Sequence, residues 1–215
     1  MRSRGRAYST NPGPNAKFFR QGFNPPMTRV YLDHNATTPL RPEARAAVVA
    51  ALDLAGNASA VHREGRDARR IVEEARSAVA RLVCGDPRCV TFTSGGSEAA
   101  ATLLSPAFVG RGEARGPFTR LIVSAVEHSC VLSGGRFAPE AVEVCPVDGA
   151  GRIDLNSLAA RLAEDRGPAL VAVMAANNET GVIQPLADVA ALCRAHGAGL
   201  VVDAVQALGK MPLDM

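Results

Sequence analysis

Short apolar segments alternate with amphipathic segments along residues 90–202 of this 215-residue chain. Segments that are apolar throughout, rather than at every second position, are typical of parallel strands buried on both faces. The segments between them carry apolar residues at spacings of three and four, the period of helices that pack on one side. The alternation predicts an α/β fold, with a mostly parallel sheet and helices on both of its faces.

The expected elements follow from these runs and from the residues that bound them. Pro42 suits a first helical turn, and Gly197 suits a helix end. We expect strands at 30–33, 90–93, 121–125, 142–145, 169–174 and 200–202. We expect helices at 42–52, 65–83, 97–109, 155–164 and 185–196, and a short helix or turn at 129–138. Ligands bind beyond the carboxyl ends of the strands in such sheets, so the segments that follow the strands are where a site is expected.

Composition and charge exclude several other classes of protein. No apolar run approaches the roughly 18 residues of a membrane-spanning helix, so we expect no membrane partner. The net charge is +3, with no basic face after residue 33, so we expect no nucleic-acid partner. No CxxC pair or matching histidine spacing indicates a metal site. Free thiols in a reducing compartment are favoured over disulfides for the five cysteines, Cys84, Cys89, Cys130, Cys145 and Cys193.

Residues 1–28 lack periodicity and are rich in Arg, Gly, Pro, Asn and Ser, which predicts a disordered extension. Two interpretations remain open. The segment carries arginines and no acid, as mitochondrial transit peptides do. Alternatively, the start codon was assigned too early and Met27 is the first residue. Four prolines disfavour a targeting helix and favour the second interpretation. The expected compartment is the cytoplasm, or the mitochondrial matrix if the segment is a transit peptide.

A glycine pair joins the predicted strand at 90–93 to the next helix, in the sequence Thr-Ser-Gly95-Gly96-Ser97-Glu. Glycine lets the backbone approach an anion closely, and a helix N-terminus binds phosphate. Ser97 adds a hydroxyl donor. The absence of a Walker lysine and of GxGxxG argues against a nucleotide-binding module. Gly96 and Ser97 are therefore candidate phosphate ligands, with an ordinary glycine-rich turn as the alternative.

Polar side chains follow the other predicted strands. His128 could stack on a flat cofactor, and Asn178 could donate to a ring oxygen. Asp203, with Gln206 three positions later, ends a buried apolar run and needs a partner such as a protonated pyridine nitrogen. Each has a structural alternative: a surface or capping histidine, an Asx turn or a helix cap. Together these residues match what pyridoxal phosphate requires.

Several longer stretches resemble one family. By them the chain resembles the amino-terminal half of a NifS/IscS-type cysteine desulfurase, a class V aminotransferase-like enzyme of pyridoxal phosphate fold type I. The stretches occur in family order from about residue 29 to the last residue. They are Tyr31-Leu-Asp-His-Asn-Ala-Thr-Thr-Pro39, Gly56-Asn-Ala-Ser-Ala-Val-His62, Phe92-Thr-Ser-Gly-Gly-Ser-Glu98, Glu127-His128, Asn177-Asn-Glu-Thr-Gly181 and Val202-Asp-Ala-Val-Gln206.

The resemblance implies pyridoxal 5'-phosphate as the cofactor, with Gly96 and Ser97 at its phosphate. It implies that His128 stacks on the ring and takes part in proton transfer, and that Asp203 pairs with the ring nitrogen. The ring oxygen would accept hydrogen bonds from two amides, those of Asn178 and Gln206.

The family reaction converts L-cysteine to L-alanine and passes the sulfur on as a persulfide. It supplies iron–sulfur cluster assembly, nitrogenase maturation or tRNA thiolation. The implied partners are L-cysteine, a second copy of the chain in a homodimer, and a sulfur acceptor or iron–sulfur scaffold protein.

Two groups that the family chemistry needs have no match. The Schiff-base lysine lies in a Ser-x-His-Lys segment, whereas this chain has only Lys17 and Lys210. None of the five cysteines corresponds to the persulfide-forming nucleophile. We therefore expect residues 29–215 to be a partial cofactor-binding large domain, truncated before its last strands, without the C-terminal small domain and inactive as it stands. Two alternatives are a non-catalytic chain that binds cofactor weakly or only dimerises, and another class V aminotransferase or a selenocysteine lyase.

Overall fold

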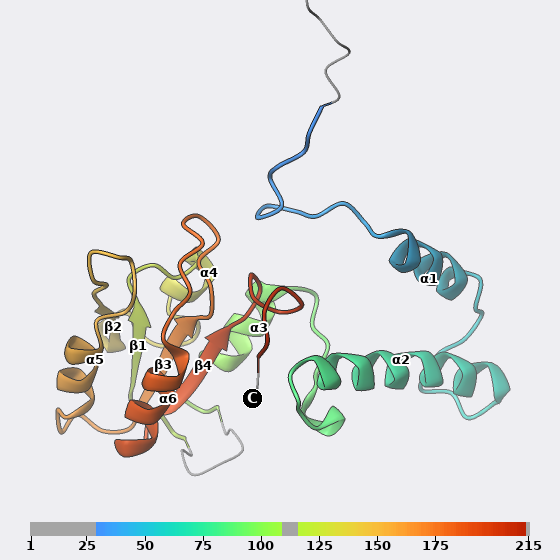
Figure 1. Ribbon diagram of the computed structural model, residues 1–215. Coiled ribbons are helices and arrows are strands. Elements are labelled where there is room, and N and C mark those ends of the chain that lie inside the picture. Colours follow the sequence, from blue (N-terminus) through green and yellow to red (C-terminus); the bar gives the residue numbers. More distant parts are fainter. Residues whose placement is uncertain (1–28, 109–115, 214–215) are drawn as a thin grey trace, which may run out of the picture. The chain divides into compact units, whose positions relative to one another are not determined.

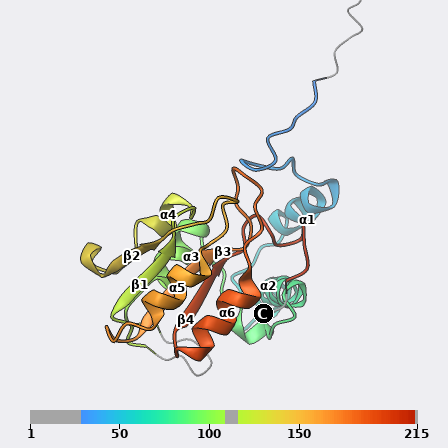
Figure 2. The ribbon, with the colours of Figure 1, turned by 60° about the vertical axis from the view of Figure 1, so that its left-hand side comes forward.

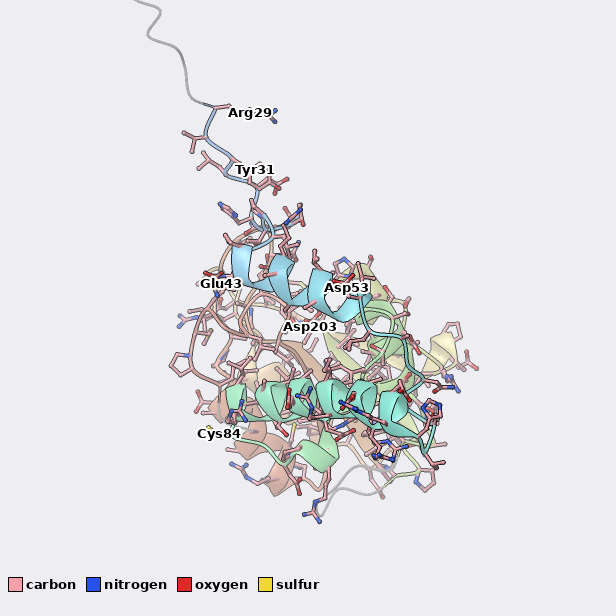
Figure 3. The ribbon with its side chains drawn as sticks, turned by 90° about the vertical axis from the view of Figure 1, so that its right-hand side faces the viewer. Arg29, Tyr31, Glu43, Asp53, Cys84 and Asp203 are labelled. Carbon is pink, nitrogen blue, oxygen red and sulfur yellow. The ribbon has the colours of Figure 1, made fainter. Side chains whose placement is uncertain are left out.

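The computed structural model describes residues 29–108 and 116–213, so the predicted extension at 1–28 lies outside the described residues. The chain divides after His34 into two units, and each is described by itself. In the first unit, the Tyr31 hydroxyl donates to the carbonyl oxygen of Asp33 at 2.8 Å, and the Tyr31 ring packs edge-on against His34. Arg29 and Tyr31 lie on an extended segment in Figure 3. The strand predicted at 30–33 is wrong, because these residues do not form a strand.

The second unit contains a four-stranded parallel sheet in the order β2-β1-β3-β4 (Figure 1). Its strands are β1 (Arg120–Ser124), β2 (Val142–Cys145), β3 (Ala169–Met174) and β4 (Gly199–Asp203). Every pairing between them is parallel, and the register places Met174 opposite Asp203. The predicted parallel sheet is therefore confirmed, and the carboxyl ends of its strands share one edge.

The helices lie close to the predicted ranges, except that those predicted at 97–109 and 129–138 end about six residues early. They are α1 (Pro42–Leu52), α2 (Arg63–Leu82), α3 (Gly96–Leu103), α4 (Ser129–Leu132), α5 (Leu155–Leu162) and α6 (Leu186–Ala195), with 3-10 turns η2 (Pro87–Cys89) and η3 (Pro139–Ala141). The short helix α4 ends before Gly134 and Gly135, whose positive φ angles suit a turn. Among the described residues, none of these helices is long and apolar enough to cross a bilayer.

Alternate residues of the strands belong to two separate cores, one on each face of the sheet. Figure 2 shows α5 and α6 along one of these faces. One core joins the sheet to α5 and α6 through Ile122, Val171, Val173, Leu158 and Val189. The other core lies on the opposite face, towards α3 and α4, and contains Leu121, Val123, Leu170, Leu104 and Val131. Burial on both faces explains why β3 is apolar at every position and β1 at its three central positions, and it confirms that helices cover both faces of the sheet.

The strand predicted at 90–93 is not formed. The Val90 amide donates to the carbonyl oxygen of Pro87 at 3.1 Å, and the Val90 carbonyl accepts from Arg76 of α2. These local and helix contacts take the place of strand pairing. Phe92 remains half exposed and lies under the Arg76 guanidinium, 5.1 Å from ring centroid to Cζ. An apolar run of this length becomes a strand only where another strand offers hydrogen bonds, and the described residues place none beside it.

The turn after α4 fits closely against the end of α3. Gly135 has φ +59°, and a Cβ built on it would lie 2.4 Å from the carbonyl oxygen of Leu104. We expect Gly135→Ala to lower the free energy of unfolding by about 2 kcal/mol or more, because strain and overlap add. Urea denaturation measures this loss. Gly197→Ala is the control, since Gly197 also has positive φ but no atom within 4 Å of its Cβ position. Equal losses in both variants would contradict a contribution from overlap.

Candidate functional site

Three parallel strands bring predicted site residues to one edge of the sheet. His128 follows β1 and Asn178 follows β3. Asp203, labelled in Figure 3, is the last residue of β4. The loops after these strands are held together by backbone bonds, such as the Ala175 amide donating to the Asp203 carbonyl oxygen at 2.8 Å. The edge is the one where ligands bind in sheets of this type.

The first turn of α3 lies beside the loop that follows β4. A Cβ built on Gly96 would lie 4.0 Å from a methyl carbon of Val205. The first amides of an α-helix have no acceptor within the helix and attract anions. The Glu98 side chain folds back on Ser94, whose hydroxyl and amide both donate to Glu98 Oε2 at 2.6 Å. These two hydrogen bonds lower the pKa of the Glu98 carboxyl, and the bond from the hydroxyl has the larger effect. Gly96 and Ser97, both exposed, therefore present amides and a hydroxyl at the edge of the sheet.

Asp203 places a carboxylate at the end of β4. The side chain is partly buried, and its Oδ1 accepts from the Val205 amide at 2.9 Å. The helix cap that the sequence left open as an alternative is not formed, because a turn and no helix follows Asp203.

Asn35 connects the two predicted amide donors. Its side-chain Nδ2 donates to the backbone carbonyl oxygen of Asn178 at 2.5 Å, and its backbone carbonyl oxygen accepts from Gln206 Nε2 at 2.9 Å. Gln206 Oε1 also accepts from Lys210 Nζ at 2.6 Å, while Asn178 Nδ2 donates to Glu179 Oε1 at 2.6 Å. Each amide nitrogen carries two hydrogens, so one contact does not exhaust it. The motif around Asn35 was visible in the sequence, but its bridging role was not.

His128 caps the N-terminus of α4. Its Nδ1 lies 3.3 Å from the Cys130 amide nitrogen, which donates to it, and 3.0 Å from Cys130 Sγ. The capping alternative for this histidine is therefore realised, and its exposed ring stands at the same edge as Asp203.

Glu127 is a functional candidate that sequence reasoning missed. It is 6% exposed, and its Oε1 accepts from the Met174 amide, opposite Asp203 in the ladder, at 2.7 Å. Its Oε2 is buried without a hydrogen-bond partner. Burial raises the pKa of Glu127 to about 8; the Met174 amide lowers it, and the charge of Asp203 raises it further. The available signal was an acid directly following a strand that is apolar enough to be buried throughout.

Asn177 holds the loop after β3 in place. Its Oδ1 accepts from the amides of Glu179 at 2.9 Å and Thr180 at 2.8 Å, and its Nδ2 donates to the carbonyl oxygen of Val126 at 2.9 Å. The Asx turn that the sequence suggested for Asn178 is therefore formed by Asn177. The result ties the loop after β3 to the loop after β1.

Comparison with known proteins identifies the family. The aminotransferase class-V family matches residues 30–215. The chain belongs to the class-V aminotransferase family. It is 37% identical over 188 residues to the IscS-like cysteine desulfurase of Mycobacterium tuberculosis and 40% identical over 193 residues to a cysteine desulfurase of Cereibacter sphaeroides. These alignments cover 86% and 87% of the chain and 48% of each relative. The chain thus spans about half the length of the curated relatives it matches.

Solved structures of class-V aminotransferase type show the same fold. A NifS-like protein from Rickettsia africae matches with a TM-score of 0.76 and 29% identity, over 86% of this chain and 50% of that protein. DndA from Streptomyces lividans matches with a TM-score of 0.66 and 36% identity, over 85% and 51%. The described chain therefore has the fold of about half of each of these proteins.

Pyridoxal phosphate is the cofactor that the class-V aminotransferase family implies, and the edge of the sheet fits it. The open first turn of α3 suits a phosphate, and the carboxylate of Asp203 suits a protonated ring nitrogen. Within residues 29–108 and 116–213, no group of three or more His, Cys, Asp or Glu could hold a metal ion.

Proposed function

We propose that residues 29–215 form part of the cofactor-binding large domain of a cysteine desulfurase. The observation that carries the proposal is the placement of the Asp203 carboxylate at the end of β4, on the edge that also receives the first turn of α3. The proposed cofactor-binding residues are Gly96, Ser97, His128, Asn178, Asp203 and Gln206.

Each of these side chains has a proposed task. When bound, pyridoxal phosphate withdraws electrons from the α-carbon of an amino acid. Asp203 holds the proton on the ring nitrogen by its negative charge, and the amides and hydroxyl at Gly96 and Ser97 bind the phosphate. His128 orients the ring by stacking and can move a proton through the imidazole nitrogen that does not contact Cys130. Asn178 and Gln206 each direct a side-chain amide hydrogen at the ring oxygen.

For the whole protein we propose that L-cysteine is converted to L-alanine while the sulfur leaves as a persulfide. Relatives named cysteine desulfurase support this, as does the similarity to a structure of SspA in complex with cysteine, at 26% identity and TM-score 0.69. We also propose a homodimer that delivers sulfur to iron–sulfur cluster assembly or to thiolation, through an acceptor or scaffold protein. Bacterial relatives favour a cytoplasmic location, and a relative named mitochondrial in Arthroderma benhamiae favours the matrix.

The positions of the two lysines in the 215-residue chain decide whether it can bind the cofactor covalently. They are Lys17 and Lys210, and neither occupies the family's Ser-x-His-Lys segment. Lys210 Nζ already donates to Gln206. We therefore propose that the 215-residue chain binds pyridoxal phosphate without a covalent anchor and releases no alanine from cysteine.

Cofactor titration tests the proposal. We expect calorimetry to detect binding of pyridoxal phosphate to the chain, and Asp203→Ala to weaken it about 10- to 100-fold, because a charge-assisted hydrogen bond is lost. Asp188→Ala is the control, since Asp188 is exposed in the first turn of α6 and should leave the affinity unchanged. Equal affinities of the wild type and Asp203→Ala would refute the assignment of the edge.

A further inference from the structure

Cys130 differs from the other four thiols in its contacts. Cys145 and Cys193 are buried, and burial raises the pKa of both thiols, that of Cys193 to about 11. Cys84 and Cys89 are exposed at the surface. Cys130 is partly buried, and within the described residues it is the one thiol with a recorded contact to an imidazole, at 3.0 Å from His128 Nδ1.

Two groups of Cys130 converge on one ring nitrogen. Its amide donates to His128 Nδ1 at 3.3 Å, and its Sγ lies 3.0 Å from the same atom. An amide can only donate, so Nδ1 is the acceptor, and the neutral ring carries its proton on Nε2. A thiol is a weak donor that can share this acceptor. The two contacts thus select one tautomer and fix the plane of the ring.

Cys130 is itself held by the fold. It packs against the core that contains Leu121 and Val131, and its carbonyl oxygen accepts from the Ser133 hydroxyl at 3.0 Å. The short helix α4, on which it lies, packs against α3. Because Cys130 is held against the buried core, its contact with His128 fixes the exposed imidazole relative to that core.

We propose that Cys130 is a positioning residue: its thiol, together with its amide, keeps Nδ1 of His128 as an acceptor and directs the Nε2 proton towards the cofactor edge. The link to the cofactor rests on the proposed function. A histidine whose tautomer is set in advance presents one defined group to a ligand, since the second nitrogen's hydrogen bond decides which nitrogen holds the proton.

Nitrogen NMR of the full chain tests the proposal directly. With ¹⁵N-labelled histidine, long-range ¹H–¹⁵N spectra at pH 8 report the tautomer of each of the four histidines, and His128→Asn assigns the His128 signals. We expect His128 to be mostly Nε2-protonated in the wild type. We expect Cys130→Ala to lower the tautomer ratio about three- to tenfold, because the amide contact remains but the thiol is lost.

Matched variants separate the thiol from general effects. Cys130→Ser should restore most of the ratio, because a hydroxyl can also donate to Nδ1. Cys89→Ala should leave it unchanged. His62, whose Nδ1 lies 2.9 Å from Glu64 Oε2, is an internal reference that should not respond to Cys130.

An unchanged His128 tautomer ratio in Cys130→Ala would overturn the proposal. If that variant does not fold, the folded Cys84→Ser/Cys89→Ser chain can be S-methylated at Cys130, which removes the thiol hydrogen and should lower the ratio in the same way. A separate titration with pyridoxal phosphate distinguishes this proposal from the proposed function. A tautomer change without cofactor binding keeps the role of Cys130 towards His128 and rejects the cofactor site.

Discussion

Glu127→Gln is expected to abolish a loss of stability that the wild-type chain undergoes between about pH 4.5 and pH 8. Burial raises the pKa of this carboxyl from its ordinary value of 4.5 to about 8 in the folded chain. The folded state therefore keeps the proton in a window where the unfolded chain releases it, and stability falls as pH rises through this window. The slope is about 1.4 kcal/mol per pH unit, so the whole loss is about 5 kcal/mol.

Urea denaturation at pH 4.5, 6 and 8 measures this loss in both chains. Other groups that titrate in this range contribute equally to the wild type and to Glu127→Gln, so the difference between the two pH profiles isolates Glu127. The nearest charge recorded for it is Asp203, and its Oε1 bonds to the Met174 amide, which a glutamine oxygen can also accept. Glu140→Gln, at an exposed glutamate, is the control. Parallel profiles for the wild type and Glu127→Gln would show that Glu127 is ionised normally.

The sequence predicted the sheet where burial is continuous. β1 and β3 were found as apolar runs because the three central residues of β1 and all six residues of β3 are apolar and buried. β4 was found from its apolar residues, although all but Gly199 are only partly buried. Residues 90–93 alternate Val and Phe with Thr and form no strand, because strand formation depends on a partner that the segment itself does not specify. The short helix α4 was predicted too long for a similar reason, since its end is set by the packing of Gly135 on Leu104.

The candidate site divides in the same way. Four of its residues were predictable one by one, because each lies at or after the end of a strand and topology assigns strand ends to one edge: His128, Asn178, Asp203 and Gln206. Gly96 and Ser97 were predicted from a strand at 90–93 that is not formed. The connections between the site residues were not predictable. Asn35 meets Asn178 and Gln206 across 143 and 171 positions, and Glu127 meets Met174 across 47. Such contacts leave no local period or spacing, so only the folded arrangement reveals that Glu127 is buried and that Asn35 joins two loops.

Away from the candidate site, on strand β2, Glu143→Gln is expected to lower the free energy of unfolding by about 3 to 5 kcal/mol. Arg120, at the start of β1, has a side chain that is 4% exposed, and its Nη1 lies 3.4 Å from Glu143 Oε1. Glu143 is 10% exposed and also lies 2.9 Å from Arg166 Nη1. Removing one member of a buried pair leaves the other charge uncompensated. The resulting loss of stability is larger than the net stabilisation that the intact pair provides.

Urea denaturation of two glutamate variants tests this reasoning. Glu164 also faces Arg120, at 3.9 Å, but its side chain is 47% exposed, so Glu164→Gln should cost less than about 1 kcal/mol. The double variant Arg120→Met/Glu143→Leu should recover much of the stability lost in Glu143→Gln, since it removes the buried charge of Arg120 together with its partner. A loss in Glu143→Gln no larger than that in Glu164→Gln would mean that water or the carbonyl oxygens of Arg161 and Glu164, which accept from Arg120 at 2.9 and 3.3 Å, already compensate the guanidinium.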